Sequence, residues 1–321
     1  MNPTLFVYEY LSGGGRGAAP GDDAGHAELL RAGRAMRAAL VAELAALPGL
    51  DLRYACGAGV EALPAQQGAA VCPRPGETPA AFVQREGAAH ERIWVVAPES
   101  DGLLLQLAEA VPPARWIGCD RATIRLCAGK RATLAHLAAQ RVPTPLDFGE
   151  GATHWVVKPD DGAGTLDTRR HAQRAAAQAD LWRRRASGAS ATVEPWVDGE
   201  PLSLSLLCQG GEAELLSINR QHIDIAADGQ LHDAGVAINQ ITLDDGRAPA
   251  LARIAQAVAH AMPGLRGFVG IDLVWHPRRG PVVIEVNPRL TCAFVGLSAA
   301  LGRTLAAEIL ALHEEPADAA A

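Results

Sequence analysis

Residues 267–289 read GFVGIDLVWHPRRGPVVIEVNPR, two apolar stretches joined by a short basic turn at residues 277–280. The first stretch carries Asp272, and the second carries Glu285 and Asn287. Residues two apart on a strand face the same side, so Glu285 and Asn287 share a face, and strand pairing can bring Asp272 to it. The sequence therefore predicts a β-hairpin with three oxygen donors gathered on one face.

A divalent cation would stabilise such a cluster of oxygens. Two carboxylates in an apolar setting repel each other unless they are neutralised, and Mg²⁺ prefers oxygen ligands that substrate phosphates complete. Arg289 follows directly and suits a phosphate or a carboxylate. The alternative is an ordinary hairpin with exposed polar residues, but the flanking residues have the pattern of strands that are buried on both faces.

The chain has only two lysines among its 29 basic residues, Lys130 and Lys158. Lys158 ends the apolar stretch of HWVVKPDDGAGT, residues 154–165, and precedes Gly162 and Gly164. Glycines let backbone N–H groups wrap phosphate oxygens, and a lysine supplies the point charge. In isolation a plain turn with an exposed lysine would be the favoured interpretation, because short glycine motifs are common.

The segment VEPWVDGE, residues 193–200, has the form of an extended hinge that begins with an acid. Such a segment can bind adenine through backbone groups near Trp196 and Val197, while Glu194 accepts from the exocyclic amine. Glu200 can accept from ribose hydroxyls. A β-hairpin with surface acids fits the same letters.

Taken in order, these elements resemble the ATP-grasp superfamily. The match consists of Lys130 before a helix, VVKPDDGAG, EPWVDGE and the metal-binding pair GIDLV and IEVNPR, and it spans about residues 116–312. EVNPR is its most specific element. Both lysines of the chain fall where this family uses lysines.

The resemblance implies two cofactors, ATP and Mg²⁺, with Mn²⁺ as an alternative metal ion. It also implies a role for each matching residue. The implied roles are phosphate contacts for Lys130 and Lys158, a closing loop at residues 161–165 with Gly162 and Gly164, adenine contacts for Glu194, Trp196 and Val197, a ribose contact for Glu200, metal ligation by Asp272, Glu285 and Asn287, and stabilisation of the transferred phosphate by Arg289.

One position departs from the related dipeptide ligases. These ligases often carry an arginine two residues before the first metal aspartate, where this chain has Gly270. The charge that stabilises the oxyanion would then come from Arg289 or Arg220. Lys158 is the third residue for which the resemblance implies a catalytic role.

The fold that the resemblance implies is α/β. An N-terminal parallel α/β pre-ATP-grasp domain is followed along the chain by an α+β ATP-grasp part. Alternating strand and helix signals in the first third independently indicate a parallel, covered sheet. The expected segments are an N-terminal domain at 1–115, a lid subdomain at 116–193, a catalytic subdomain at 194–314 and a disordered tail at 315–321. Two helices are expected at His171–Ser187 and Gly296–Leu312.

The activity that the resemblance implies is ADP-forming ligation of a carboxylate to an amine through an acyl phosphate. A narrower resemblance, to the tyramine–glutamate ligases of methanofuran-type cofactor biosynthesis, comes from YEYLSGGG (8–15) and SINRQ (217–221). It implies glutamate and tyramine or tyrosine as substrates. The expected contacts are Glu9, Asn219, Arg220 and Gln221, although SINRQ also fits an edge strand with polar ends. Another ATP-grasp amino-acid or dipeptide ligase and a non-catalytic ATP-binding protein are the alternatives.

Composition narrows the partners to small molecules. A net charge of −7 argues against nucleic acid, no apolar run approaches a membrane span, and the first residues lack a signal peptide pattern, so a cytoplasmic location is expected. A homodimer is compatible with the resemblance.

The glycines of YEYLSGGG suggest a dinucleotide-binding fold. They do not open the following helix, however, and the second expected strand, DLRYACGAG, lacks an acid that could bind a ribose.

Overall fold

The computed structural model describes residues 2–15, 23–162 and 164–314. The predicted tail at 315–321 lies outside them. The chain divides into two compact units, which are described separately. The first comprises residues 1–98, 103–121 and 289–321, and the second comprises residues 99–102 and 122–288.

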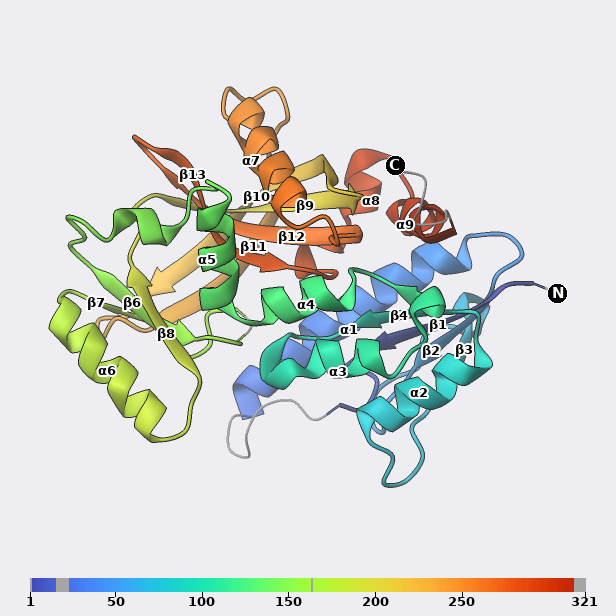
Figure 1. Cartoon of the computed structure of the whole chain (residues 1–321). Coiled ribbons are helices and arrows are strands. Elements are labelled where there is room, and N and C mark those ends of the chain that lie inside the picture. Colours follow the sequence, from blue (N-terminus) through green and yellow to red (C-terminus); the bar gives the residue numbers. More distant parts are fainter. Residues whose placement is uncertain (1, 16–22, 163, 315–321) are drawn as a thin grey trace. The chain divides into compact units, whose positions relative to one another are not determined.

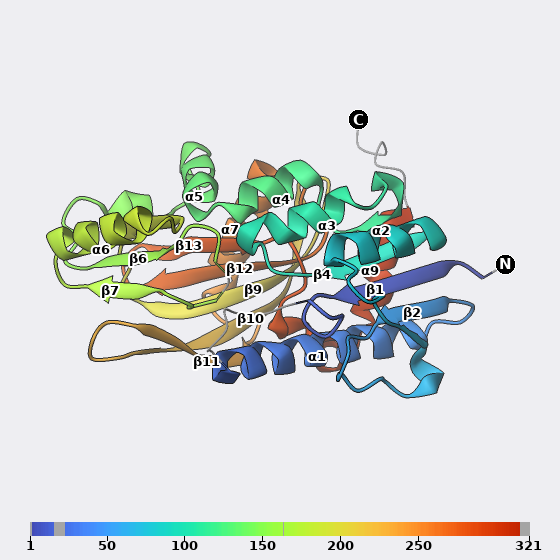
Figure 2. The ribbon, with the colours of Figure 1, turned by 90° about the horizontal axis from the view of Figure 1, so that it is seen from below.

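The first unit contains a five-stranded, wholly parallel sheet with strand order β3-β2-β1-β4-β5. Its central strand is the apolar run TLFVYE, which is buried from Leu5 onward. Figure 2 shows α1 along one side of this sheet, with α2 and α3 along the other. The strands are β1 (Thr4–Glu9), β2 (Asp51–Ala55), β3 (Ala69–Val71), β4 (Arg92–Val96) and β5 (Trp116–Ile117), and the three helices are α1 (Asp23–Ala45), α2 (Pro79–Ala89) and α3 (Leu103–Glu109).

The C-terminal segment of the chain packs with this first unit. The backbone N–H of Ala306 donates to the Glu43 carboxylate of α1 at 3.0 Å, and His313 Nε2 accepts from the N–H of Gly118 at 2.9 Å. The predicted helix at Gly296–Leu312 is in fact two, α8 (Leu297–Leu301) and α9 (Leu305–Glu314). Gly302 separates them because it adopts a left-handed conformation, with φ of 64°.

The second unit contains two antiparallel sheets, which Figure 1 shows in green to yellow and in yellow to red. The smaller sheet has the order β7-β6-β8, with β6 (Trp155–Pro159), β7 (Arg169–His171) and β8 (Ala191–Pro195). The larger sheet has the order β11-β10-β9-β12-β13, with β9 (Glu200–Gln209), β10 (Glu212–Ile225), β11 (Leu231–Ile241), β12 (Gly267–His276) and β13 (Gly280–Asn287).

Helices cover both of these sheets. On the smaller sheet, Ala177 and Leu181 of α6 form a buried cluster with Val157 and Ala191. On the larger sheet, α7 packs through an apolar face that includes Leu251. The helices of this unit are α4 (Arg121–Ala128, whose first residue belongs to the first unit), α5 (Lys130–Ala139), α6 (Arg174–Ala186) and α7 (Ala248–Ala261).

The predicted helix at His171–Ser187 begins later than expected. Its first residue, His171, belongs to strand β7, which pairs with β6 and was not predicted. His171 Nε2 donates to the Asp180 carboxylate of α6 at 3.0 Å. Long-range pairing therefore overrides a local pattern that is also compatible with a helix.

The tip of the β10–β11 hairpin is hydrogen-bonded to strand β7. The N–H of Arg170 donates to the carbonyl of Gly229 at 2.8 Å, and the N–H of Leu231 donates to the carbonyl of Thr168 at 2.8 Å. Arg169 also forms an ion pair with Asp228 at 2.9 Å. These contacts fasten the strand that follows the glycine-rich loop to the larger sheet.

The predicted parallel α/β character of the N-terminal part is confirmed by the first sheet, and the predicted hairpin with its turn at residues 277–280 is confirmed by the pairing of β12 and β13. The structure divides the C-terminal part differently from the expected 194–314 segment, because residues after Pro288 cluster with the first unit. Among the described helices, none is both long and apolar enough to cross a membrane.

Substitution of Gly229 tests the attachment of the hairpin tip. Gly229 has φ of 88°, and a Cβ there would lie 2.2 Å from the carbonyl oxygen of Arg170, whereas Gly235, with φ of 103°, faces open space. Both Gly229→Ala and Gly235→Ala introduce backbone strain. We expect Gly229→Ala to lower the free energy of unfolding by about 2 kcal/mol more than Gly235→Ala. Urea denaturation measures the difference, and equal losses would contradict the packing at Gly229.

Candidate active site

A row of polar side chains crosses four strands on one face of the larger sheet. Asn219 of β10 is opposite Ser203 of β9, and Ser203 is opposite Asp272 of β12. Asp272 in turn is opposite Glu285 of β13. Directly opposed residues point to the same face. The two carboxylates predicted to bind metal are therefore neighbours.

The next residues along these strands point to the opposite face, where β9 and β12 carry apolar side chains. Leu202 of β9 is opposite Leu273 of β12, and both are buried. A β-bulge interrupts the pairing of β12 and β13 directly after Asp272, so that Leu273 pairs with Val283. Bulges re-aim side chains and are frequent beside active sites. Here the bulge lies between the two carboxylate-bearing positions and the hairpin turn.

Two amide side chains donate hydrogen bonds to the Asp272 carboxylate. Gln221 Nε2 donates to Oδ1 at 2.8 Å, and Asn287 Nδ2 donates to Oδ2 at 3.1 Å. Because the nitrogen of Asn287 is directed at Asp272, the amide oxygen is its ligand atom for a cation. The structure therefore brings together all three residues predicted to bind metal.

Lys130 lies beside the second carboxylate. Its Nζ is 2.9 Å from Glu285 Oε1, and it also donates to the carbonyl of Gly162 in the glycine-rich loop. Lys130 is the first residue of α5 and is 5% exposed. A buried ammonium needs such partners, and the same charge is well placed for a phosphate that approaches the carboxylates.

Asp160 explains why acids occur in a loop expected to bind an anion. Its carboxylate accepts from the N–H of Arg131 at 2.8 Å, and its carbonyl accepts from the N–H of Lys130 at 2.8 Å. Both N–H groups belong to the first turn of α5, where donors have no partner within the helix. Asp160 thus fastens the loop to the helix that carries Lys130. The sequence shows only that two acids precede Gly162.

The second lysine pairs with the first acid of the hinge. Lys158 Nζ is 2.5 Å from Glu194 Oε1, and both side chains are buried. Trp196 follows, with its indole N–H donating to Asp198 at 3.0 Å and the Arg170 guanidinium 5.4 Å from its ring. The adjacent Val197 is 4% exposed. The structure therefore groups the residues predicted to contact adenine and phosphate on strands β6 and β8 and the hinge after them.

The predicted glycine-rich loop follows β6. Gly162 carries the carbonyl that Lys130 contacts, and Gly164 has φ of 65°, a conformation that favours glycine. The Asp161 carboxylate accepts from the N–H of Asp101 at 3.2 Å. Residue 163 lies outside the described part of the chain. Closure of this loop over a nucleotide stays a prediction.

Glu200 and Arg220 form a separate charged cluster on the opposite face of the sheet. Glu200 Oε1 is 2.7 Å from Arg220 Nε, and Glu200 Oε2 is 2.7 Å from Arg247 Nη1. Arg247 precedes α7 and also pairs with Asp245 at 3.0 Å. Arg220 is next to Asn219 on β10 and therefore points away from Asp272. Sequence reasoning missed Arg247, which no motif distinguishes from the other arginines.

Asn219 is fully hydrogen-bonded within the sheet. Its Oδ1 accepts from Ser217 Oγ and from the N–H of Asn239, each at 3.0 Å. Its Nδ2 donates to Ser205 Oγ at 3.1 Å and to Ser203 Oγ at 3.4 Å. These four bonds satisfy the amide. Asn219 therefore orders the polar face, and its predicted contact with a substrate would require one of these bonds to break.

Glu9 is the last residue of strand β1 in the first unit, and the backbone of the loop that follows donates hydrogen bonds to its carboxylate. Oε1 accepts from the N–H of Leu11 at 3.2 Å, and Oε2 accepts from the N–H of Ser12 at 2.8 Å. Gly33 of α1 lies so close that a Cβ there would be 2.6 Å from the carboxylate oxygens. Burial raises the pKa of Glu9, and the hydrogen bonds from Ser12 and Leu11 oppose this effect. Glu9 thus shapes the YEYLSGGG loop, and its contact with an amine stays a prediction.

Arg289 is the first residue after Pro288 and clusters with the first unit. Its Nη1 donates to the carbonyl of Leu290 at 3.1 Å. Its predicted role at a transferred phosphate stays a prediction.

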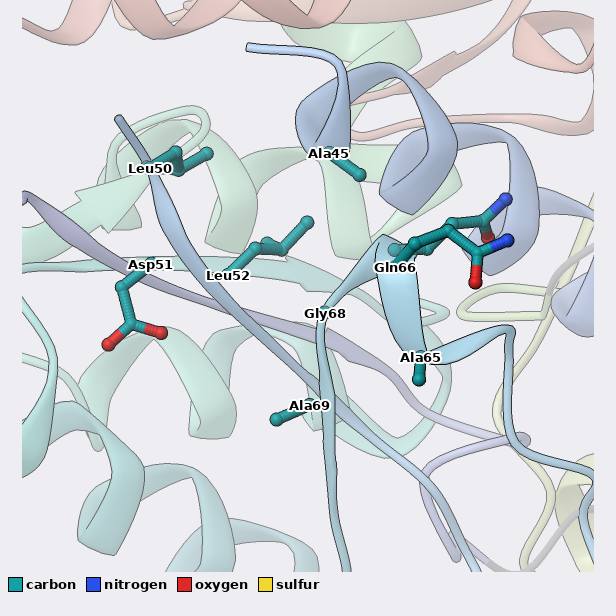
Figure 3. Close-up of a pocket in the computed structure, with 9 residues that line it drawn as sticks. Ala45, Leu50, Asp51, Leu52, Ala65, Gln66, Gly68 and Ala69 are labelled. Atoms are coloured by element: carbon teal, nitrogen blue, oxygen red, sulfur yellow. The ribbon is translucent and has the colours of Figure 1, made fainter. Parts of the chain in front are cut away.

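A cavity of about 450 Å³ lies elsewhere in the first unit (Figure 3). It is lined by Ala45 at the end of α1, by Asp51 and Leu52 at the start of β2, and by Gln66 and Ala69 before and at the start of β3. Parallel sheets bind ligands at the carboxyl ends of their strands. This cavity lies at the amino ends, so it is a poor candidate for the active site.

The donors around Asp272 fit a hard divalent cation. Two carboxylates and one amide oxygen are the ligand types that Mg²⁺ and Mn²⁺ prefer. Lys130 offsets the negative charge of Glu285. Among the described residues no three His, Cys, Asp or Glu side chains form a metal cluster, so a cation here would also need Asn287 and oxygens that a substrate brings.

Comparison with protein families matches both parts of the chain. Residues 59–124 match the pre ATP-grasp 3 domain, and residues 127–293, more than half of the chain, match the ATP-grasp domain. The chain therefore belongs to the ATP-grasp family.

Solved structures agree on the fold. An ATP-grasp superfamily protein from Archaeoglobus fulgidus is 19% identical with a TM-score of 0.67, covering 96% of this chain and 88% of that one. An L-amino acid ligase from Bacillus licheniformis is 17% identical with a TM-score of 0.65, covering 96% and 73%. A D-Ala:D-Ser ligase from Enterococcus faecalis is 12% identical with a TM-score of 0.68, covering 98% and 100%. The predicted ATP-grasp fold is confirmed. No curated protein gives a significant match.

The raised pKa of Glu9 predicts a pH dependence of stability. The folded state holds this proton more tightly than the unfolded chain, so the free energy of unfolding falls as pH rises from the unfolded pKa, about 4.3, through the folded pKa. Glu9→Gln removes the titration. We expect its stability relative to the wild type to increase with pH over this window and then level off.

Urea denaturation from pH 4 to pH 8 measures the effect. Glu61→Gln is the matched control, since Glu61 is 85% exposed. A Glu9→Gln difference as flat with pH as that of Glu61→Gln would contradict the burial of the Glu9 carboxylate.

Proposed function

We propose that this chain is an ATP-dependent ligase that joins a carboxylate to an amine and releases ADP. The observation that supports it is the pairing of the only two lysines with two acids of the candidate site, Lys130 with Glu285 and Lys158 with Glu194. Buried ion pairs are costly where stability alone is at stake. The Lys158–Glu194 pair is buried and the Lys130–Glu285 pair is largely buried, and two such lysines are what a site for a polyphosphate needs.

The residues of the chain would act mainly by positioning and neutralising charge. Bound MgATP would supply the phosphoryl group that activates the carboxylate as an acyl phosphate, which the amine then displaces. Lys130 and Lys158 would move from their acids to phosphate oxygens. Asp272, Glu285 and Asn287 would hold the cation, and the loop at 161–165 would keep water from the acyl phosphate.

We propose glutamate as the carboxylate substrate and tyramine or tyrosine as the amine, as in methanofuran-type cofactor biosynthesis. The support is the position of the YEYLSGGG loop, at the carboxyl end of β1. Strand β1 pairs with β2 on one side and with β4 on the other. Where the strand order of a parallel sheet reverses in this way, a switch point forms at which ligands bind. Support from SINRQ is weaker, because Asn219 and Gln221 already make hydrogen bonds within the sheet.

That weakness favours a second candidate, another ATP-grasp amino-acid or dipeptide ligase. The solved L-amino acid ligase and D-Ala:D-Ser ligase have the same fold. A non-catalytic ATP-binding protein fits less well, since every phosphate and metal residue of the family pattern is present.

Incubation of the purified protein with MgATP, glutamate and either tyramine or tyrosine tests the substrates, with mass detection of the amide and ADP release as readouts. A panel of amino acids and dipeptides runs in parallel. We expect a glutamyl amide to form with stoichiometric ADP. ADP release with another pair only would favour the second candidate, and no ADP with any pair would contradict the ligase proposal.

Lys158→Ala and Glu285→Ala should each lower ADP formation by a factor on the order of 10²–10³, because each removes a charge that acts on the phosphates. Glu212→Ala is the control for Glu285→Ala, since Glu212 is exposed on the same sheet. Circular dichroism checks that the variants are folded. ADP production at the wild-type rate by either folded variant would contradict the site.

A further inference from the structure

Gln221 lies between the predicted substrate segment SINRQ and the metal carboxylates. It is two residues after Asn219 on β10, so it points to the same face of the sheet as Asp272. Strand β9 separates β10 from β12. The Gln221 side chain spans this strand and donates to Asp272 Oδ1 at 2.8 Å.

We propose that Gln221 is a positioning residue that fixes the Asp272 carboxylate for the divalent cation, rather than a contact for the substrate. This inference rests on the metal site of the proposed function. It assigns Gln221 a role that differs from the one its place in SINRQ predicts.

The hydrogen bonds at Asp272 carry the argument. Gln221 donates to Oδ1, and Asn287 donates to Oδ2, so one amide holds each oxygen and the plane of the carboxylate is fixed. Neither donor has a formal charge. An arginine or lysine in place of Gln221 would neutralise the carboxylate and compete with a cation, whereas an amide orients it and keeps its charge.

The two carboxylates of the row receive different partners. Glu285 is paired with the ammonium of Lys130 at 2.9 Å, while the partners of Asp272 include the two amides. A phosphate can attract Lys130 away from Glu285, but Gln221 has no charge that a phosphate would attract. We therefore infer that Asp272 keeps its orientation while the charges around Glu285 rearrange.

The position of Gln221 is restrained by the pairing of its strand, β10, with the neighbouring strands. β10 pairs with β9 up to Arg220, opposite Leu202, and with β11 at Gln221, opposite Val236. Pairing with β11 at Gln221, and with both strands at Arg220, restrains the backbone from which the side chain extends. Groups that orient metal ligands in this way typically change metal affinity by 10–100-fold when they are removed.

The test uses Gln221→Met, which keeps an unbranched side chain of similar length and removes the donor. Gln230→Met is the matched control, because the Gln230 side chain donates to the neighbouring Leu231 carbonyl at the hairpin tip. Asp272→Asn is the positive control. The full-length protein is titrated with Mn²⁺ in the presence of ADP, and electron paramagnetic resonance measures free Mn²⁺.

We expect Gln221→Met to raise the dissociation constant for Mn²⁺ by about tenfold, and Gln230→Met to leave it within twofold of the wild type. The Mg²⁺ concentration for half-maximal ADP release should rise in parallel, with the KM of the amine unchanged. An unchanged Mn²⁺ dissociation constant in Gln221→Met, or a change in the amine KM alone, would overturn the inference.

The controls separate this inference from the proposed function. If Asp272→Asn binds Mn²⁺ as tightly as the wild type, the metal site itself is wrong. If Asp272→Asn weakens binding and Gln221→Met does not, only the role of Gln221 is wrong. Circular dichroism checks folding, and Gln221→Ala replaces Gln221→Met if the latter does not fold, with the same expected and contradicting results.

Discussion

The alternation of side chains across the larger antiparallel sheet is the constraint on which the site depends. Successive residues point to opposite faces, so the strands place Leu202 and Leu273 on the face covered by α7 and Ser203 and Asp272 on the other. A shift of register by one residue would exchange the two faces. The fully bonded amide of Asn219 and the bulge after Asp272 hold the register that brings the carboxylates together.

Charge neutralisation links this sheet to the smaller one. Two neighbouring carboxylates need cations, and Lys130 supplies one from the start of α5. Asp160 joins the start of that helix to the loop after β6, and β6 carries Lys158. The hairpin tip at Gly229 fastens the far end of the same loop. The residues proposed to bind phosphate are therefore fixed by contacts with both sheets.

The motifs predicted which of these side chains lie together because the motifs are local. Asp272, Glu285 and Asn287 share one hairpin, where the period of two and a short turn suffice to place them together. The sequence also predicted the parallel first sheet. It failed at His171, where pairing with β6 replaces a helix, and at Gly302, where one left-handed residue divides the expected C-terminal helix. Both errors occur where distant contacts or a single backbone conformation outweigh local propensity.

The sequence by itself determined the family, the hairpin that carries Asp272, Glu285 and Asn287, and the positions of the two lysines, because each depends on residue types at short, regular spacings. Only the tertiary structure decided which neighbours of a motif act together. Arg220 and Gln221 are adjacent in SINRQ, yet Arg220 pairs with Glu200 on one face while Gln221 reaches Asp272 on the other. The physical reason is that strand order and register, which arise from contacts between distant segments, decide which side chains meet across a sheet.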